Sequence, residues 1–229
     1  MFKKLKVVAI LPAYQAEKTL LPFFKTLPKG VFDEVILVDD CSSDKTYEIA
    51  KKHRGIKAYQ NPKNLGYGGN VKQCLKTALK HGADVMIEIH PDGEYGADGI
   101  IPALLEIKQG AKFVLGNRFA KNPVSSGMFL WKYVFIRVLN LIHNLILRTN
   151  IPDLHQGFRV YTRQQLSKVN FKKMSDGYIF SFEIIVETIF KKMHISSVPV
   201  STKYQGAKRG AYFKNSLVYG LQTLAICLK

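Results

Sequence analysis

The sequence is poor in cysteine, and its three cysteines lie far apart. Cys41, Cys74 and Cys227 form no Cys-x-x-Cys pair. This spacing excludes a disulfide framework and a cysteine-based zinc site, and it is typical of a reducing compartment. An apolar signal core is also missing, because the basic N-terminus leads directly into a short strand and a proline. We therefore expect a cytoplasmic protein.

Acidic residues are scarce in the second half of the chain. Residues 1–106 contain 15 lysines and arginines against 13 acidic residues, whereas residues 107–229 contain 19 against 4. No acidic residue follows Glu187. The surplus predicts that the second half faces an anionic partner, although a solubilising surface charge would have the same composition. We expect no nucleic-acid partner, because the chain lacks the aromatic and basic run of an RNA-recognition module.

Internal repeats and low-complexity linkers are absent, so at this length we expect one domain, residues 1–229. In residues 1–118, short apolar runs alternate with amphipathic stretches. This pattern predicts α/β architecture with a Rossmann-like, mostly parallel sheet flanked by helices. The expected strands are Val7–Leu11, Val35–Val38, Lys57–Gln60, Val85–Ile89 and Phe113–Leu115, and the expected helices lie near 17–26, 44–53, 68–81 and 98–109. Ser43 or Asp44 is expected to cap the second helix, Asp98 to open the fourth and Gly82 to end the third.

The second half, residues 119–229, differs in character. The segment Phe129–Thr149 has 14 apolar residues among its 21 and a narrow polar stripe, which predicts a helix with a very wide apolar face. Charges interrupt it too often for a comfortable membrane span, so a buried core helix and an interfacial helix both remain open. The segment Ser216–Lys229 is also amphipathic and contains no acidic residue. We expect this half to contact an anionic membrane surface peripherally, on the cytoplasmic side.

The residues that follow the predicted strands are the candidates for chemistry, because ligands of parallel sheets collect at the carboxyl ends of the strands. Pro12, Tyr14 and Glu17 follow the first strand, where a base or ribose can pack. Asp39 and Asp40 follow the second strand and open a turn into a helix. Two adjacent carboxylates at a strand end exceed what helix capping needs.

Two more such segments follow the third and fourth strands. In the run Asn64–Asn70, Gly66 and Gly68 let the backbone approach an anionic ligand at a helix N-terminus, although a tight turn explains the same glycines. After the fourth strand come His90 and Asp92. A strand-end carboxylate suits a hard divalent cation that bridges the two phosphates of a nucleotide, whereas a lone histidine is more often structural.

In this order and spacing, the segments resemble glycosyltransferase family 2, within it the polyprenyl-phosphate sugar synthases similar to dolichol-phosphate mannose synthase. The resemblance covers nearly the whole chain. The segments that carry it are Pro12-Ala13-Tyr14 with Glu17, Asp39–Thr46, Asn64–Gly69, Gly116–Phe119 and Asp153–Tyr161. The resemblance implies a GT-A fold and the transfer of a sugar, with inversion, from a nucleotide-diphosphate sugar to a polyprenyl phosphate. A divalent metal, Mg²⁺ or Mn²⁺, is the implied cofactor. In this interpretation, residues 1–118 bind the nucleotide-sugar and residues 119–229 contact the acceptor and the membrane.

The resemblance also implies roles for single residues. Tyr14, Glu17 and Asp40 would contact the base and ribose. Asp92 would take the last position of the family's D-x-D metal motif, and His90 stands where its first aspartate usually is. Imidazole suits Mn²⁺ better than Mg²⁺, so this departure bears on the identity of the metal.

A polyprenyl phosphate is already an anion, so it needs cationic positioning rather than a general base. Arg118 and Arg159 are the candidates for contact with the acceptor phosphate. Lys208 and Arg209 lie between glycines in a segment that can close over the donor phosphates, although a solvated loop explains them equally well.

The sequence is also compatible with other functions. Transfer to a sugar hydroxyl would need a general base, for which Asp153 and Glu94 are the candidates. A non-catalytic nucleotide-sugar-binding protein would keep the nucleotide contacts and lack the chemistry. A nucleotidyltransferase is disfavoured, because it would need a glycine-rich loop with an arginine after the first strand.

Overall fold

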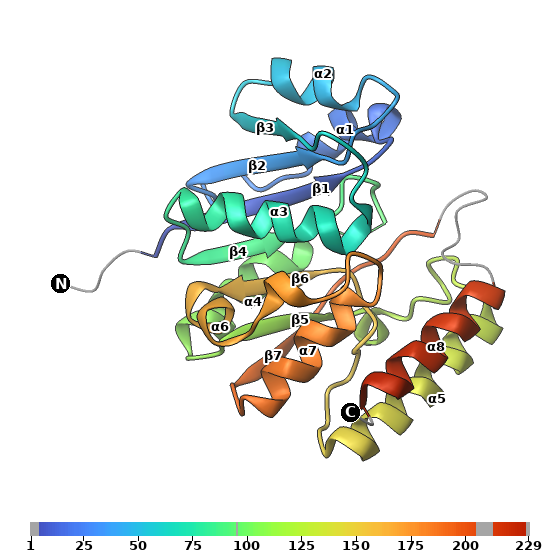
Figure 1. Ribbon diagram of the computed structural model, residues 1–229. Coiled ribbons are helices and arrows are strands. Elements are labelled where there is room, and N and C mark those ends of the chain that lie inside the picture. Colours follow the sequence, from blue (N-terminus) through green and yellow to red (C-terminus); the bar gives the residue numbers. More distant parts are fainter. Residues whose placement is uncertain (1–4, 95, 205–212, 228–229) are drawn as a thin grey trace.

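A computed structural model describes residues 5–94, 96–204 and 213–227, and it shows a seven-stranded sheet with helices on both faces (Figure 1). The strands are β1 (Val7–Ala13), β2 (Glu34–Asp39), β3 (Ile56–Gln60), β4 (Val85–Glu88), β5 (Phe113–Asn117), β6 (Arg159–Thr162) and β7 (Ile195–Pro199). The helices are α1 (Glu17–Phe24), α2 (Thr46–Lys52), α3 (Gly66–Lys80), α4 (Ile100–Lys108), α5 (Leu130–Leu147), α6 (Arg163–Lys168), α7 (Phe180–Phe190) and α8 (Phe213–Cys227). The predicted α/β class is confirmed.

The order of the strands is β3-β2-β1-β4-β6-β5-β7. The first four strands are mutually parallel, as predicted. Two strands were not predicted: β6 inserts antiparallel between β4 and β5, and β7 pairs parallel with β5. Because β6 has only four residues, its pattern is too short to show strand alternation. Its position matters for the site, since it pairs Arg159 with Glu88 of β4.

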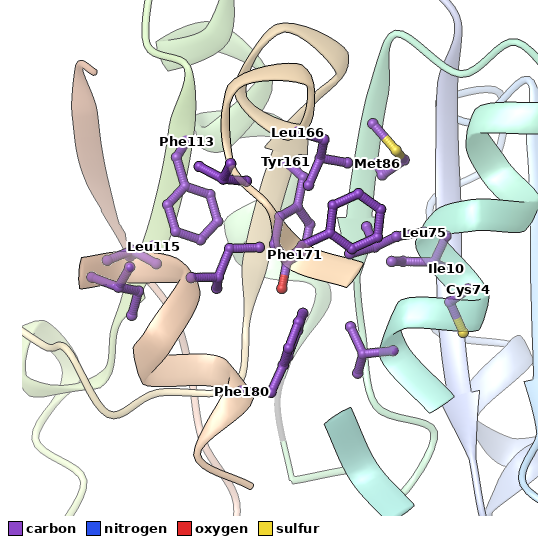
Figure 2. Close-up of a cluster of buried hydrophobic side chains, with 14 of the residues drawn as sticks. Ile10, Cys74, Leu75, Met86, Phe113, Leu115, Tyr161, Leu166, Phe171 and Phe180 are labelled. Atoms are coloured by element: carbon purple, nitrogen blue, oxygen red, sulfur yellow. The ribbon is translucent and has the colours of Figure 1, made fainter. Parts of the chain in front are cut away.

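Each face of the sheet carries its own hydrophobic core, because successive side chains of a strand point to opposite faces. Met86 of β4 packs toward α3, α6 and α7, whereas Val85 and Ile87 pack toward α1, α2 and α4. Figure 2 shows the first core, where the rings of Phe113 and Tyr161 lie 5.1 Å apart between centroids. These two cores hold the strands rigidly and leave their carboxyl ends to form a site.

The predicted end of α3 is confirmed, because Gly82 has φ +81° just after the cap residue His81, the left-handed backbone that ends a helix. At the start of α2, the residue in the cap position is Lys45, with no side-chain cap, and neither Ser43 nor Asp44 holds that position. The carboxylate of Asp44 still accepts a hydrogen bond from the backbone of Thr46, the first residue of the helix, at 3.0 Å. The expectation for Asp98 was wrong, because no side chain caps α4 and the carboxylate of Asp98 instead binds the backbone N–H and hydroxyl of Ser201. That partner lies 103 residues away in the sequence, where no local pattern indicates it.

The helices α5 and α8 pack against each other at one side of the sheet (Figure 1). Of the 18-residue window Leu130–Leu147 in α5, 33% is buried, which argues against the buried-core interpretation of this segment. By length and a mean hydropathy of 1.3, α5 is the one helix in the described part of the chain that meets the criteria for a membrane span. Its outward apolar residues are Leu130, Trp131, Val134, Val138, Leu141, Ile142, Leu145 and Ile146, and α8 adds Leu217, Val218 and Leu221.

Candidate functional site

Asp39 and Asp40 lie at the carboxyl end of β2, and both are buried. The carboxylate of Asp39 accepts hydrogen bonds from the backbone and hydroxyl of Ser42 and from Gln60, so it is committed to the turn. Asp40 accepts at Oδ1 from the side chain of Asn61 at 2.8 Å and from the backbone of Leu65 at 2.9 Å. These two bonds fix the orientation of the Asp40 carboxylate.

The segment after β1 lies beside this turn. Tyr14 is 52% exposed, whereas Pro12 is buried at the strand end. Glu17 links the two helix starts, because its carboxylate accepts from the backbone of Lys45 at 3.1 Å and its own N–H donates to Asp44 at 3.1 Å. The structure thus brings the predicted base and ribose contacts to one corner of the sheet edge, and Tyr14 is the most accessible of them.

The glycine segment opens α3, as predicted, but the close approach that it allows is to the chain itself. A Cβ on Gly68 would lie 2.6 Å from Cβ of Phe180, and one on Gly66 would lie 2.9 Å from the carbonyl oxygen of Asp176. The backbone N–H of Gly69 also donates to this carbonyl at 3.0 Å. The glycines therefore seat residues 175–180 on the start of α3, and their contact with a nucleotide-sugar stays a prediction.

Asp92 and Glu94 follow β4 at the same edge. Asp92 is exposed, and its carboxylate accepts a hydrogen bond from the backbone of Glu94 at 3.0 Å. Burial and the negative charge of Asp92 raise the pKa of Glu94, against the charges of Arg118 and Lys132. In turn, burial lowers the pKa of Lys132, which is on α5. Glu94 thus lies within electrostatic reach of two cations, one of which belongs to the apolar helix.

The centre of the edge is Glu88, a residue to which the sequence analysis assigned no role. Its fully buried carboxylate accepts from the hydroxyls of Tyr67 at 2.7 Å and Tyr161 at 2.5 Å, and it lies 3.7 Å from the Arg159 guanidinium. Burial raises the pKa of Glu88, but the hydrogen bond from His90 and the charge of Arg159 outweigh it, so the pKa is lowered overall. The signal in the sequence that could have pointed to Glu88 is that it is an acidic residue in an otherwise apolar strand.

His90 Nε2 lies 3.1 Å from the Glu88 carboxylate. Burial lowers the pKa of His90, but the hydrogen bond and charge of Glu88 outweigh it, and the pKa is raised overall. A protonated imidazole has no lone pair for a metal. The metal-ligand role predicted for His90 stays a prediction, and it would require the neutral imidazole, which the contact with Glu88 disfavours.

Arg118 is held by the segment that follows α5. Its Nε donates to Asp153 at 2.7 Å and its Nη2 to the other oxygen at 3.2 Å, a bidentate ion pair in which both residues are almost fully buried. Nη2 also donates to the carbonyl of His155. Because Asp153 is committed to Arg118, Glu94 is the better placed of the two carboxylates considered as a general base.

Arg159 is buried as well. Its Nη1 donates to the hydroxyl of Tyr67 at 3.1 Å and to the carbonyl of Gly157 at 3.3 Å, and its Nη2 donates to the carbonyl of Gln156. Its Nε has no hydrogen-bond partner among the described residues. The structure therefore brings Arg118 and Arg159 to neighbouring carbonyls of one loop. Lys208 and Arg209 lie outside the described residues.

The oxygen ligands present fit a divalent cation. In the described part of the chain, no group of three or more His, Cys, Asp or Glu side chains is arranged to hold a metal. Mg²⁺ usually binds one or two carboxylates and keeps waters and phosphate oxygens for its other positions. The exposed carboxylate of Asp92, with Glu94 beside it, is a donor set of this kind.

Comparisons with known proteins place this geometry among sugar transferases. Residues 8–169 match the family model described as Glycosyl transferase family 2. The chain is 28% identical over 216 residues to a UDP-N-acetylglucosamine–dolichyl-phosphate N-acetylglucosaminyltransferase of Methanococcus voltae, covering 86% of this chain and 86% of that protein. It is 25% identical over 209 residues to an undecaprenyl-phosphate mannosyltransferase of Micrococcus luteus, covering 86% and 83%.

Solved structures share the fold. Glucosyl-3-phosphoglycerate synthase from Mycobacterium tuberculosis, in complex with Mn²⁺, UDP and phosphoglyceric acid, superposes with a TM-score of 0.69 at 16% identity, over 97% of this chain and 77% of that one. The same enzyme with Mg²⁺ and UDP gives a TM-score of 0.69 at 18% identity, over 97% and 78%. The predicted GT-A fold is confirmed by this likeness.

Proposed function

Because the chain belongs to glycosyl transferase family 2 and is therefore a glycosyltransferase, we propose that it transfers a sugar, with inversion, from a nucleotide-diphosphate sugar to a polyprenyl phosphate at the cytoplasmic face of a membrane. The relatives named for dolichyl phosphate and undecaprenyl phosphate support this acceptor class. Family membership disfavours the non-catalytic alternative.

The observation that carries the proposal is the position of the apolar helix α5 at the site. Lys132 lies in the first turn of α5, which begins at Leu130, and it is within electrostatic range of Glu94 and Arg118. The same helix exposes Leu141 and Leu145, which are 59% and 69% accessible. An acceptor with an apolar tail and an anionic head suits this arrangement, because the tail can lie along α5 while the head reaches cations at its start.

The residues divide the chemistry as follows. Tyr14, Glu17 and Asp40 bind the nucleoside, with Asp40 Oδ2 accepting from the base edge. Asp92, with Glu94, would hold a divalent cation, whose charge would offset that of the leaving diphosphate. Arg118 and Lys132 orient the acceptor phosphate for direct attack opposite the leaving group, and no general base is needed since the phosphate is already ionised.

Product analysis tests the proposal. The purified chain is mixed with vesicles that contain undecaprenyl phosphate, with Mg²⁺ or Mn²⁺ and with a panel of nucleotide-sugars that begins with UDP-N-acetylglucosamine. We expect a lipid-linked sugar phosphate of inverted anomeric configuration. Transfer to a sugar hydroxyl or to phosphoglyceric acid, with undecaprenyl phosphate inert, would contradict the acceptor class.

That second outcome is the alternative function, and the raised pKa of Glu94 is the observation that favours it. A hydroxyl acceptor requires a base, and a carboxylate whose pKa is raised toward neutrality accepts a proton more readily. Glu94→Gln separates the two functions. It should abolish transfer to a hydroxyl, because the glutamine amide cannot accept the proton. Transfer to a polyprenyl phosphate should keep a substantial rate, because the amide oxygen can still coordinate a divalent cation.

The cationic residues make a separate prediction. Arg118→Lys should lower turnover strongly with the affinity for the donor nearly unchanged, because lysine cannot reproduce the planar fork. Arg159→Lys should likewise lower turnover with the affinity for the donor nearly unchanged. Lys208→Ala should instead weaken diphosphate binding, measured by titration with UDP and Mn²⁺, and Arg209→Ala should do so as well.

A further inference from the structure

The polar stripe of α5 is bound to the loop that holds the two arginines. We name residues 151–157 the connecting loop, which joins the end of α5 to β6. Asn140 is buried on α5, and its amide donates to the carbonyls of Ile151 at 3.0 Å and Pro152 at 3.2 Å. Its carbonyl oxygen accepts from the backbone N–H of Leu154 at 2.9 Å. The side chain of Asn140 is therefore hydrogen-bonded to the connecting loop on both sides of Asp153.

The same loop also accepts hydrogen bonds from the side chains of Arg118 and Arg159. Asp153 forms the bidentate pair with Arg118, and the carbonyls of His155 and Gln156 accept from Arg118 and Arg159. A displacement of the loop would therefore move both guanidinium groups. Because misplacement of a positioning group by about 1 Å lowers rates by about 100-fold, the anchoring of this loop has catalytic weight.

The loop also contacts α8, the second helix with exposed apolar residues. The imidazole of His155 lies 3.2 Å from the Tyr219 hydroxyl of α8 through Nδ1, and 3.2 Å from Nδ1 of His143 of α5 through Nε2. His155 of the loop therefore contacts one polar side chain of each helix. The polar side of α5 therefore packs against the connecting loop.

We infer that Asn140 is a positioning residue: it couples the exposed apolar helix pair to the acceptor end of the site by fixing the connecting loop, and through Asp153 the guanidinium of Arg118. The inference rests on the proposed function for its acceptor. Asn140 touches neither substrate, so its effect passes through Asp153 and the loop backbone.

The chain offers a matched control one turn further along α5. Asn144 also makes three side-chain hydrogen bonds, to Thr149, to the N–H of Ile151 and to the carbonyl of Ile151. These partners end at the start of the connecting loop and do not flank Asp153. Asn140→Leu and Asn144→Leu therefore remove the same number of hydrogen bonds from the same face of the same helix.

In the kinetic test, both variants are measured with UDP-N-acetylglucosamine and vesicles containing undecaprenyl phosphate. We expect Asn140→Leu to lower kcat by about tenfold or more. KM for the donor and sedimentation with vesicles should not change. Asn144→Leu should keep nearly normal kcat even where its melting temperature falls as far. Equal loss of kcat in the two variants, or no loss in Asn140→Leu, would overturn the inference.

A second readout does not depend on the acceptor. The Nε–H resonance of Arg118, assigned by its disappearance in Arg118→Lys, should exchange slowly in the wild type and in Asn144→Leu because it is buried on Asp153. In Asn140→Leu it should shift and exchange faster. If the wild type fails to use undecaprenyl phosphate but this selective shift is seen, the proposed acceptor fails and the positioning role stands; an unchanged resonance in Asn140→Leu refutes the positioning role.

Discussion

At the scale of single residues, the exposed carboxylate of Asp92 has little packing to lose. Asp92→Asn should therefore abolish the metal-dependent part of nucleoside diphosphate binding while the melting temperature without ligand stays unchanged. In the wild type, UDP with Mn²⁺ at 100 times its dissociation constant should stabilise the fold by about 2.7 kcal/mol. Thermal-shift titrations with UDP and GDP, with and without Mn²⁺, measure the difference.

The control for Asp92 is Glu48→Gln, which removes a carboxylate from the exposed face of α2. It should bind as the wild type does. Metal-dependent affinity of wild-type strength in Asp92→Asn would remove this residue from the proposed metal site and leave Glu94 as the ligand to test.

Glu88 has the opposite character, because its carboxylate is fully buried against Arg159 and two tyrosines. Glu88→Gln leaves the charge of Arg159 without its counter-charge, so the free energy of unfolding should fall by about 3 kcal/mol or more. Turnover should fall as well, because the same side chain binds His90 next to the proposed metal site. Urea denaturation and steady-state kinetics measure the two effects.

Glu34 provides a comparison at the other end of the sheet. It binds Lys6 at 2.5 Å and Lys57 at 3.1 Å, and both lysines are partly exposed. Solvent screens such pairs, so Glu34→Gln should cost about 1 kcal/mol or less and leave turnover intact. Similar losses of stability in the two variants would show that the buried network of Glu88 is not special.

At the scale of elements, the outward face of α5 makes the membrane prediction. Leu141→Asp combined with Leu145→Asp should abolish sedimentation with vesicles, because both side chains are exposed and lose only lipid contacts. The wild type should prefer anionic vesicles, since each lysine or arginine near such a surface contributes about 1 kcal/mol, and added salt should weaken binding.

The control for the membrane prediction is Leu105→Asp on α4, a leucine that is 51% exposed on another part of the surface. It should bind vesicles as the wild type does. Equal binding of the double α5 variant, or equal binding of the wild type to neutral and anionic vesicles, would contradict the proposed membrane face.

At the scale of the whole molecule, the attachment of α5 and α8 makes stability depend on pH. Burial lowers the pKa of His143 from 6.5 to about 4, and burial also lowers the pKa of its neighbour His155. Since the unfolded chain binds these protons at higher pH, the stabilisation is complete above about pH 6.5 and is lost as the pH falls toward 4. His143 alone contributes at most about 3 kcal/mol to this loss.

Urea denaturation between pH 7.5 and pH 4 measures this dependence. His143→Gln should show a shallower fall of the unfolding free energy in this range, because glutamine does not titrate. A slope identical to that of the wild type would mean that His143 is not the group responsible.

Much of the sheet and the outline of the site could be read from local patterns. The first five strands, the parallel direction of the first four and the strand-end positions of Asp40 and Asp92 follow from apolar runs that end in polar residues. These features are local, because a strand and the turn after it are determined mainly by neighbouring residues. The charge asymmetry and the wide apolar face of Phe129–Thr149 are likewise properties of the sequence itself.

Only the tertiary structure decided the partners of the buried charges. Arg118 meets Asp153 across 35 residues, and the Arg159 guanidinium meets Glu88 because β6 runs antiparallel beside β4. Likewise, the apolar pattern of α5 is compatible with burial or exposure, and its packing on α8 at the side of the sheet left that face outward. Such contacts depend on how distant elements meet in space, and periodicity along one segment does not encode where its neighbours will lie.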